Sequence, residues 1–185
     1  MASHVDNLLK AYKRHVTLPW TAILAPSQRV WFAIYPKEDE RKLRYKVDSF
    51  GLTTVEAGKK WLLIDLTNVF STWMDDQPYR DRYFTTPQAL PTKKAAFLKD
   101  VSEHVIRLCR DAHVGDDTVI GLLGAASLFG FSHISELVPI VAEKVQGRIL
   151  VFFPGSRQGN TYRLMDAREG WNYLATAIVA GTTEG

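Results

Sequence analysis

The amino-acid sequence predicts an α/β fold: a three-layer sandwich on a mostly parallel sheet, with Rossmann-like or P-loop-like topology but without a phosphate-binding loop. Short apolar runs alternate along the chain with segments whose apolar residues recur at helical spacing, a pattern typical of βαβ units covered on both faces. There is no internal repeat and no linker long enough to separate two domains, so residues 1–185 are expected to form a single domain. The four apolar runs are 29–35, 61–66, 118–123 and 148–153.

The first half of the chain predicts two strands, each preceded and followed by a helix. Ser3 is a good N-cap for the first helix, because its hydroxyl can accept a hydrogen bond from the first turn. The first strand is closed by Pro36, and the charged segment after it has helical spacing as far as Gly51, where the helix is expected to stop. Thr67 follows the second strand and is the expected cap of the next helix.

The second half predicts two more strands separated by helices. A long polar and aromatic connection is expected over 79–91, before the third strand. Ser132 is the expected cap of the helix that follows the third strand, and the fourth strand is expected to end at Pro154 and Gly155. The other expected elements are helices over 93–111 and 133–145, an edge strand over 162–165 and an apolar segment over 171–178.

The composition is that of a folded protein in a reducing compartment. The chain is 46% hydrophobic and 23% charged, which excludes global disorder. Its one cysteine, Cys109, cannot form an internal disulfide and is expected to be a small buried apolar residue. The first 13 residues contain no signal-peptide core, and no apolar run approaches the roughly 20 residues that a membrane span needs. We therefore expect a soluble, cytoplasmic protein without membrane partners.

In open parallel sheets, ligands bind beyond the carboxyl ends of the strands. A phosphate loop needs closely spaced glycines, a lysine and a serine or threonine. The segment after the third strand has the glycines and Ser127 but no lysine, and the first strand is followed by no glycine. No cofactor is therefore assigned, although binding of a nucleotide without hydrolysis stays open. The expected lining of a strand-end cleft is Pro36, Asp65, Gly124, Ser127 and Gly155.

No complete catalytic or metal-binding set is present in the sequence. The five histidines are scattered, and no pair has the short spacing of a zinc site. The G-x-S-x-G pattern of a nucleophile elbow is absent around Ser156. Adjacent carboxylates, such as Asp75 and Asp76, do not converge on one substrate. We therefore assign no catalytic residue and no metal ligand, and expect that the protein is not an enzyme.

Two groups of arginines and tyrosines are candidates for a partner or nucleic-acid surface. Arginine and tyrosine are enriched at interface hot spots and also stack on bases. The formal net charge is only +3 at pH 7, so any nucleic-acid binding is expected to be weak. The alternative is that the first group is a loop folded against the domain. The first group is Tyr79, Arg80, Arg82 and Tyr83, and the second is Arg157 and Arg163.

Three pieces of the segment from Thr118 to Gly155, with its continuation to Asp166, form an ordered set. They are a strand followed by Ser127-Leu128-Phe129, the helix that opens after Ser132, and Val151-Phe152-Phe153-Pro154-Gly155 with Tyr162-Arg163-Leu164 after a polar loop. In this set the chain resembles the BrxB family of BREX (bacteriophage exclusion) systems. The two upstream strands occur in the family's order and spacing, so the resemblance covers most of the chain.

This resemblance implies a cytoplasmic component of a multi-protein system that blocks phage replication and marks host DNA by methylation. It also implies a direct partner, the phosphatase-like component PglZ. The family offers no catalytic motif, so no active-site residue is transferred to this chain. Together with the missing catalytic sets, the resemblance predicts a non-catalytic adaptor or scaffold of a phage-resistance complex. The alternatives are a degenerate nucleotide-sensing domain and a weak nucleic-acid-binding module.

Overall fold

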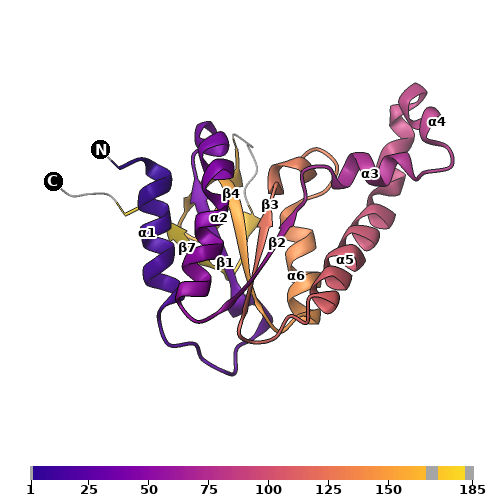
Figure 1. The fold of residues 1–185 in the computed structure, drawn as a ribbon. Coiled ribbons are helices and arrows are strands. Elements are labelled where there is room, and N and C mark those ends of the chain that lie inside the picture. Colours follow the sequence, from indigo (N-terminus) through magenta and orange to yellow (C-terminus); the bar gives the residue numbers. More distant parts are fainter. Residues whose placement is uncertain (1, 166–170, 182–185) are drawn as a thin grey trace.

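The computed structural model describes residues 2–165 and 171–181, and its centre is a seven-stranded sheet (Figure 1). Five strands lie in the order β2-β3-β4-β1-β7, and each is parallel to its neighbour. The predicted α/β class with a mostly parallel sheet is therefore confirmed. The bounds of these strands are Val30–Tyr35 for β1, Lys60–Asp65 for β2, Thr118–Leu123 for β3, Arg148–Gln158 for β4 and Thr176–Val179 for β7.

The strand order distinguishes the two topologies that the sequence left open. In the Rossmann order the first three strands are neighbours, 3-2-1. Here β1 lies between β4 and β7, while β2 and β3 lie on the far side of β4. The sheet therefore has the P-loop-like order.

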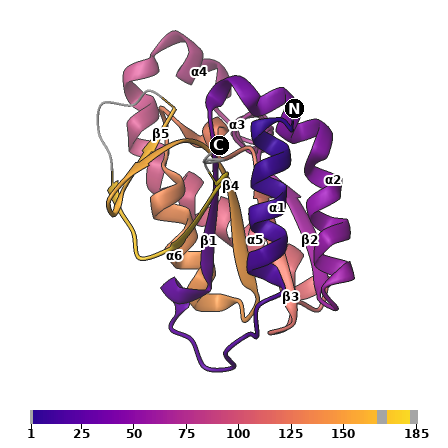
Figure 2. The ribbon, with the colours of Figure 1, turned by 90° about the vertical axis from the view of Figure 1, so that its left-hand side faces the viewer.

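Helices cover both faces of the sheet and complete the three layers (Figures 1 and 2). Helices α1 and α2 pack together on one face, and α5 and α6 pack together on the other. Side chains of β1 alternate between the two resulting cores: Phe32 lies in the core under α5 and α6, and Trp31 in the core under α1 and α2. The helices span His4–Val16 for α1, Glu40–Glu56 for α2, Val69–Asp75 for α3, Arg80–Thr85 for α4, Lys94–Asp111 for α5 and Ile134–Lys144 for α6.

Helix α1 begins as the sequence predicts. The Ser3 hydroxyl accepts a hydrogen bond from the Asp6 backbone N–H at 3.2 Å, and the Asp6 carboxylate accepts one from the Ser3 backbone N–H at 2.9 Å. This reciprocal capping box satisfies two backbone donors that the helix cannot satisfy itself. Lys46 of α2 pairs with the same carboxylate and joins α1 to its neighbour.

Helix α2 does not stop at Gly51, so that prediction is wrong. The helix continues to Glu56 and is followed by Gly58, whose φ of 73° suits glycine. A Cβ at Gly51 would lie 2.8 Å from the indole of Trp61, and a Cβ at Gly121 of β3 would lie 2.5 Å from the same side chain. Both glycines therefore make room for Trp61, which fills the slot between α2 and the sheet.

Two predicted caps are also wrong. The residue at the N-cap of α3 is Asn68, and the hydroxyl of Thr67 bonds to Asp65 instead. Helix α6 begins after His133, one residue later than predicted. Glu136 satisfies the start of α6, because its carboxylate accepts from the His133 N–H at 3.1 Å and from the Ser132 hydroxyl at 3.2 Å.

Strand β4 continues past Pro154 and Gly155, so the predicted end of the fourth strand is wrong. Residues 155–158 pair antiparallel with β5 (Thr161–Leu164), which in turn pairs with β6 (Trp171–Asn172). A Cβ at Gly155 would lie 2.0 Å from the carbonyl oxygen of Arg163, so only glycine permits this hairpin. Within the described residues, no helix is long and apolar enough to cross a membrane.

Candidate functional site

The carboxyl ends of β1 and β2 are linked by a polar network centred on Arg44 of α2. Tyr35, the last residue of β1, donates its hydroxyl hydrogen to Glu40 at 2.5 Å. Arg44 donates to the same carboxylate at 2.7 Å and to the Thr67 hydroxyl at 2.9 Å. Its other terminal nitrogen lies 3.5 Å from the Asp65 carboxylate. We call these five residues the strand-end network.

The strand-end network satisfies its own polar groups. Burial, followed by the hydrogen bond to Glu40, raises the pKa of Tyr35 above its ordinary value, so the phenol stays protonated and donates. Asp65 accepts from the backbone N–H of Thr67 at 2.9 Å as well as pairing with Arg44. A carboxylate held in this way caps a turn and balances the charge of Arg44.

The glycine turn after β3 closes directly over this network. Gly124 has a φ of 79°, and a Cβ there would lie 2.7 Å from both the backbone nitrogen and the hydroxyl of Thr67. It would also lie 3.1 Å from the Asp65 carboxylate. The Ser127 N–H donates to the Gly124 carbonyl at 2.9 Å, so this backbone donor is bonded within the turn. These contacts account for Gly124 by packing.

The expected cleft residues lie at the ends of neighbouring strands: Pro36 and Gly155 each follow one member of the register pair Tyr35 and Pro154. Asp65 and Gly124 are in contact, while Ser127 lies in the short 3-10 helix η4 (Ala125–Leu128). Pro36 precedes another such helix, η2 (Lys37–Asp39), and Gly155 lies in the β4–β5 hairpin.

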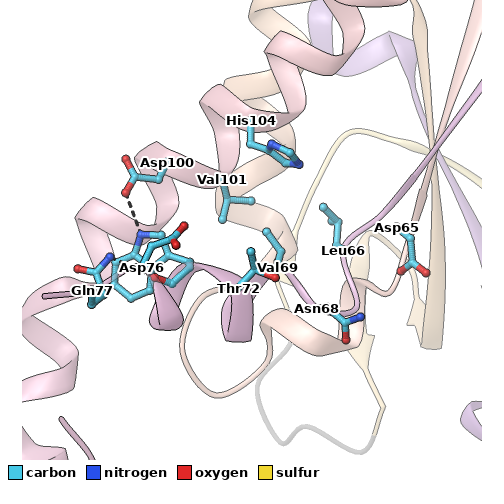
Figure 3. Close-up of a pocket in the computed structure, with 11 residues that line it drawn as sticks. Asp65, Leu66, Asn68, Val69, Thr72, Asp76, Gln77, Asp100, Val101 and His104 are labelled. Atoms are coloured by element: carbon cyan, nitrogen blue, oxygen red, sulfur yellow. Dashed lines mark hydrogen bonds between the residues drawn. The ribbon is translucent and has the colours of Figure 1, made fainter. Parts of the chain in front are cut away.

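A pocket of about 400 Å³ lies beyond the carboxyl end of β2, between α3 and α5 (Figure 3). In this view Asp65 and Gln77 lie at opposite ends of the pocket, and His104 projects from α5. The indole N–H of Trp73 donates to the Asp100 carboxylate at 2.8 Å and fixes α3 against α5. The lining consists of Asp65, Leu66, Asn68, Val69, Thr72, Trp73, Asp76, Gln77, Asp100, Val101 and His104.

The lining combines apolar walls with carboxylates. Val69, Trp73 and Val101 supply apolar surface, and Asp76 and Asp100 are exposed acids. A long basic side chain fits such a surface, because its methylene stem packs on apolar groups while its charge meets the acids. In the described part of the chain, no group of three or more His, Cys, Asp or Glu residues could hold a metal ion.

Sequence reasoning assigned only Asp65 of this lining. Trp73 and Asp100 both lie in predicted helices, but they are 27 residues apart, and only packing brings them together. The one feature of the sequence that could have indicated this pocket lining is a tryptophan on a short helix. A tryptophan there indicates a buried core position equally well.

The first arginine and tyrosine group lies on a projection that we call the arm, residues 79–93. It contains α4 and the 3-10 helix η3 (Pro87–Lys93), so the expected polar and aromatic connection is largely helical. Figure 1 shows α4 standing away from the sheet, past the end of α5. Tyr79 and Phe84 are 70% and 71% exposed, and Arg82 is exposed beside them. Tyr83 instead packs against the core.

The second basic group lies on a different element, the β4–β5 hairpin. The Arg157 guanidinium stacks over the ring of Tyr162 at 5.6 Å and donates to Asn160 at 3.3 Å. Arg163 faces Ser156 across the hairpin and is exposed. Arg157 thus has internal contacts.

Cys109 lies on the buried face of α5, where burial raises the pKa of its thiol to about 11. A thiol with this pKa is almost entirely protonated at neutral pH and is a poor nucleophile.

Comparison with protein-family models, with curated proteins and with solved structures gave no match to this chain.

Proposed function

We propose that this protein is a non-catalytic adaptor of a BREX phage-defence complex and that it binds the phosphatase-like component PglZ through the arm and the adjoining pocket. The observation that carries the proposal is the exposure of two large aromatic side chains, Tyr79 and Phe84, on an arm that stands away from the sheet. Exposed aromatic clusters flanked by polar groups mark protein interaction surfaces.

The arm has the composition and the support of a binding surface. Arg82 is exposed beside the aromatic residues, and tyrosine and arginine are enriched among the residues that dominate binding energy. Tyr83 and Leu90 pack against the core, so the arm has an inward side that holds it in place. Arg80 pairs with Asp75 at 3.4 Å at the base of α4.

The pocket extends this surface. Asp76 and Gln77 line the pocket, and Pro78 alone separates them from Tyr79 in the chain. A partner that contacts the arm therefore reaches an acidic pocket suited to a lysine or arginine side chain. The strand-end network, by contrast, is engaged in internal hydrogen bonds and pairs, which favours a binding role for this end of the molecule over a catalytic one. PglZ is proposed as the partner because the chain resembles the BrxB family.

The test is co-purification from cells that express the whole defence system. The tagged wild-type chain is expected to recover PglZ, and the double variant Tyr79→Ala/Phe84→Ala is expected to recover at least tenfold less, because loss of hot-spot aromatics costs 2 kcal/mol or more each. Ile23→Ala is the matched control, since Ile23 is an exposed apolar residue on a distant loop. Recovery of the wild-type chain alone would overturn the adaptor proposal.

Nucleic-acid binding by the arm is tested in a separate experiment, a gel-shift assay. It would give a gel shift with DNA or RNA at low salt that disappears in Arg80→Ala/Arg82→Ala and weakens steeply as salt is raised. We expect no shift, because Arg80 is already paired with Asp75 and with Asp81 at 3.8 Å.

A further inference from the structure

The pocket between α3 and α5 is elongated. It follows α3 along its whole length, because the lining residues from this helix and its C-cap recur at the spacing of one helix face: Val69, Thr72, Trp73 and Asp76. From Val69 to Asp76 the distance along the helix axis is about 10 Å, since each helical residue rises by about 1.5 Å. The opposite wall is one face of α5. A ligand that fills this pocket is therefore an extended molecule.

The lining carries negative charge that is only partly balanced. It contains three aspartates, Asp65, Asp76 and Asp100, and no lysine or arginine. Asp65 pairs with Arg44, whereas among the described residues no lysine or arginine forms an ion pair with either of the other two. Asp100 accepts a hydrogen bond from the indole of Trp73, which is uncharged. The pocket therefore favours a cation.

The histidine of the lining does not offset this charge. A terminal nitrogen of Arg107 lies 2.9 Å from Nδ1 of His104. Because a guanidinium has only donors, Nδ1 must accept, and the imidazole in this contact is uncharged. Arg107 itself is exposed and is not part of the lining.

The spacing of the carboxylates favours an organic cation over a metal ion. In the described part of the chain, no three His, Cys, Asp or Glu residues are grouped closely enough to hold a metal. Figure 3 shows Val69, Thr72 and Val101 between the Asp65 end of the pocket and the Gln77 end. The acidic ends are thus separated by apolar surface, on which methylene groups pack while their charged ends meet the acids.

We propose that this pocket binds a free aliphatic polyamine, a flexible chain of methylene groups with an ammonium group at each end. One terminal ammonium meets Asp76 and Asp100, and the methylene groups lie along Val69 and Val101. The other terminal ammonium meets Asp65, which keeps its pair with Arg44, so this end contributes less. A lysine or arginine of a protein partner would bring similar chemistry but only one charge, and would leave one acidic end of the pocket empty.

The test is isothermal titration calorimetry of the isolated chain with spermidine, a trivalent polyamine. The matched probe is hexaamminecobalt(III), a compact cation of the same charge without methylene groups. We expect spermidine to bind at least tenfold more tightly, because burial of about two methylene groups is worth a factor of about ten. Equal affinity for the two cations, or no heat of binding with spermidine, would overturn the proposal.

Charge-neutral variants locate the site. Asp76→Asn/Asp100→Asn removes two charges without changing side-chain shape, and an asparagine oxygen can still accept from the Trp73 indole. We expect this variant to weaken spermidine binding roughly tenfold. Asp111→Asn is the control, since Asp111 is an exposed acid on the same helix but outside the lining. An equal loss in both variants would show that spermidine follows the net charge of the chain, and would overturn the site.

The polyamine would occupy the place that the proposed function gives to a basic side chain of the partner. Competition between the two rests on the proposed function, whereas the calorimetry does not. In co-purification from cells that express the whole defence system, added spermidine is expected to lower the recovery of PglZ. Failure to recover PglZ without spermidine would overturn the proposed function alone, and recovery that spermidine leaves unchanged would overturn the competition.

Discussion

The strand-end network and the arm contain the same kinds of side chain, and the fold uses them in opposite ways. In the network, Arg44 and Tyr35 are bonded to Glu40, and Arg44 also contacts Thr67 and Asp65. In the arm, Tyr79 is exposed and Arg80 makes only two longer contacts with exposed acids. In the network the charged groups bond mainly to one another, whereas the large side chains of the arm are exposed. Asp65 belongs to both regions, since it pairs with Arg44 and also lines the pocket.

The largest expected effect is on the glycine turn that closes the network. In Gly124→Ala, the alanine would have to adopt a positive φ, and its methyl group would lie against the backbone nitrogen of Thr67. We expect the free energy of unfolding to fall by about 3 kcal/mol from strain and overpacking together. Urea denaturation measures this loss in the free energy of unfolding. Gly130→Ala is the matched control, because Gly130 also has a positive φ, 90°, but nothing lies within 4 Å of its Cβ position. Equal losses in the two variants would show that the contact with Thr67 contributes nothing.

The next effect compares one residue type in the two regions. Arg44→Ala removes the centre of the network and leaves Glu40 and Asp65 without their shared cation, and we expect a loss of roughly 1 to 2 kcal/mol. Arg80→Ala is expected to change stability by no more than about 0.5 kcal/mol, because its ion pairs are exposed. The same denaturation experiment measures both. A reversed order would contradict the division between a structural network and a binding arm.

The strands could be predicted from sequence because each is a short apolar run between amphipathic segments, and the parallel sheet follows from that alternation. The functions of individual glycines could not be predicted in the same way. Gly51 was expected to end a helix, but its environment is set by Trp61, ten residues further along the chain. Gly155 was expected to close a strand, and its position is fixed instead by the carbonyl of Arg163 across a hairpin.

The candidate surface was harder to predict than the fold. The arginines and tyrosines of the arm were found because they are consecutive in sequence, but nothing in the sequence showed which would point inward. Tyr83 packs against the core while Tyr79 stays exposed, and this depends on how α4 lies against η3. Strand order was also not predictable, and it is strand order that leaves β2 with an open edge.

The smallest expected effect depends on pH and compares an engaged carboxylate with an exposed one. Burial tends to raise the pKa of Glu136, but Lys94 at 2.9 Å and the His133 and Ser132 donors outweigh it, so the pKa is lowered overall. A lowered folded-state pKa contributes stability above the unfolded value, near 4.5, and that stability is lost as pH falls through the folded pKa. Glu136→Gln is therefore expected to lower the free energy of unfolding by about 0.5 to 1 kcal/mol at pH 7, with the deficit shrinking as pH falls below the unfolded value of 4.5. Asp81→Asn in the exposed α4 is expected to leave the free energy of unfolding unchanged both at pH 7 and at acidic pH. Denaturation curves at several pH values measure both variants, and a Glu136→Gln deficit that grows on acidification would contradict the assigned sign.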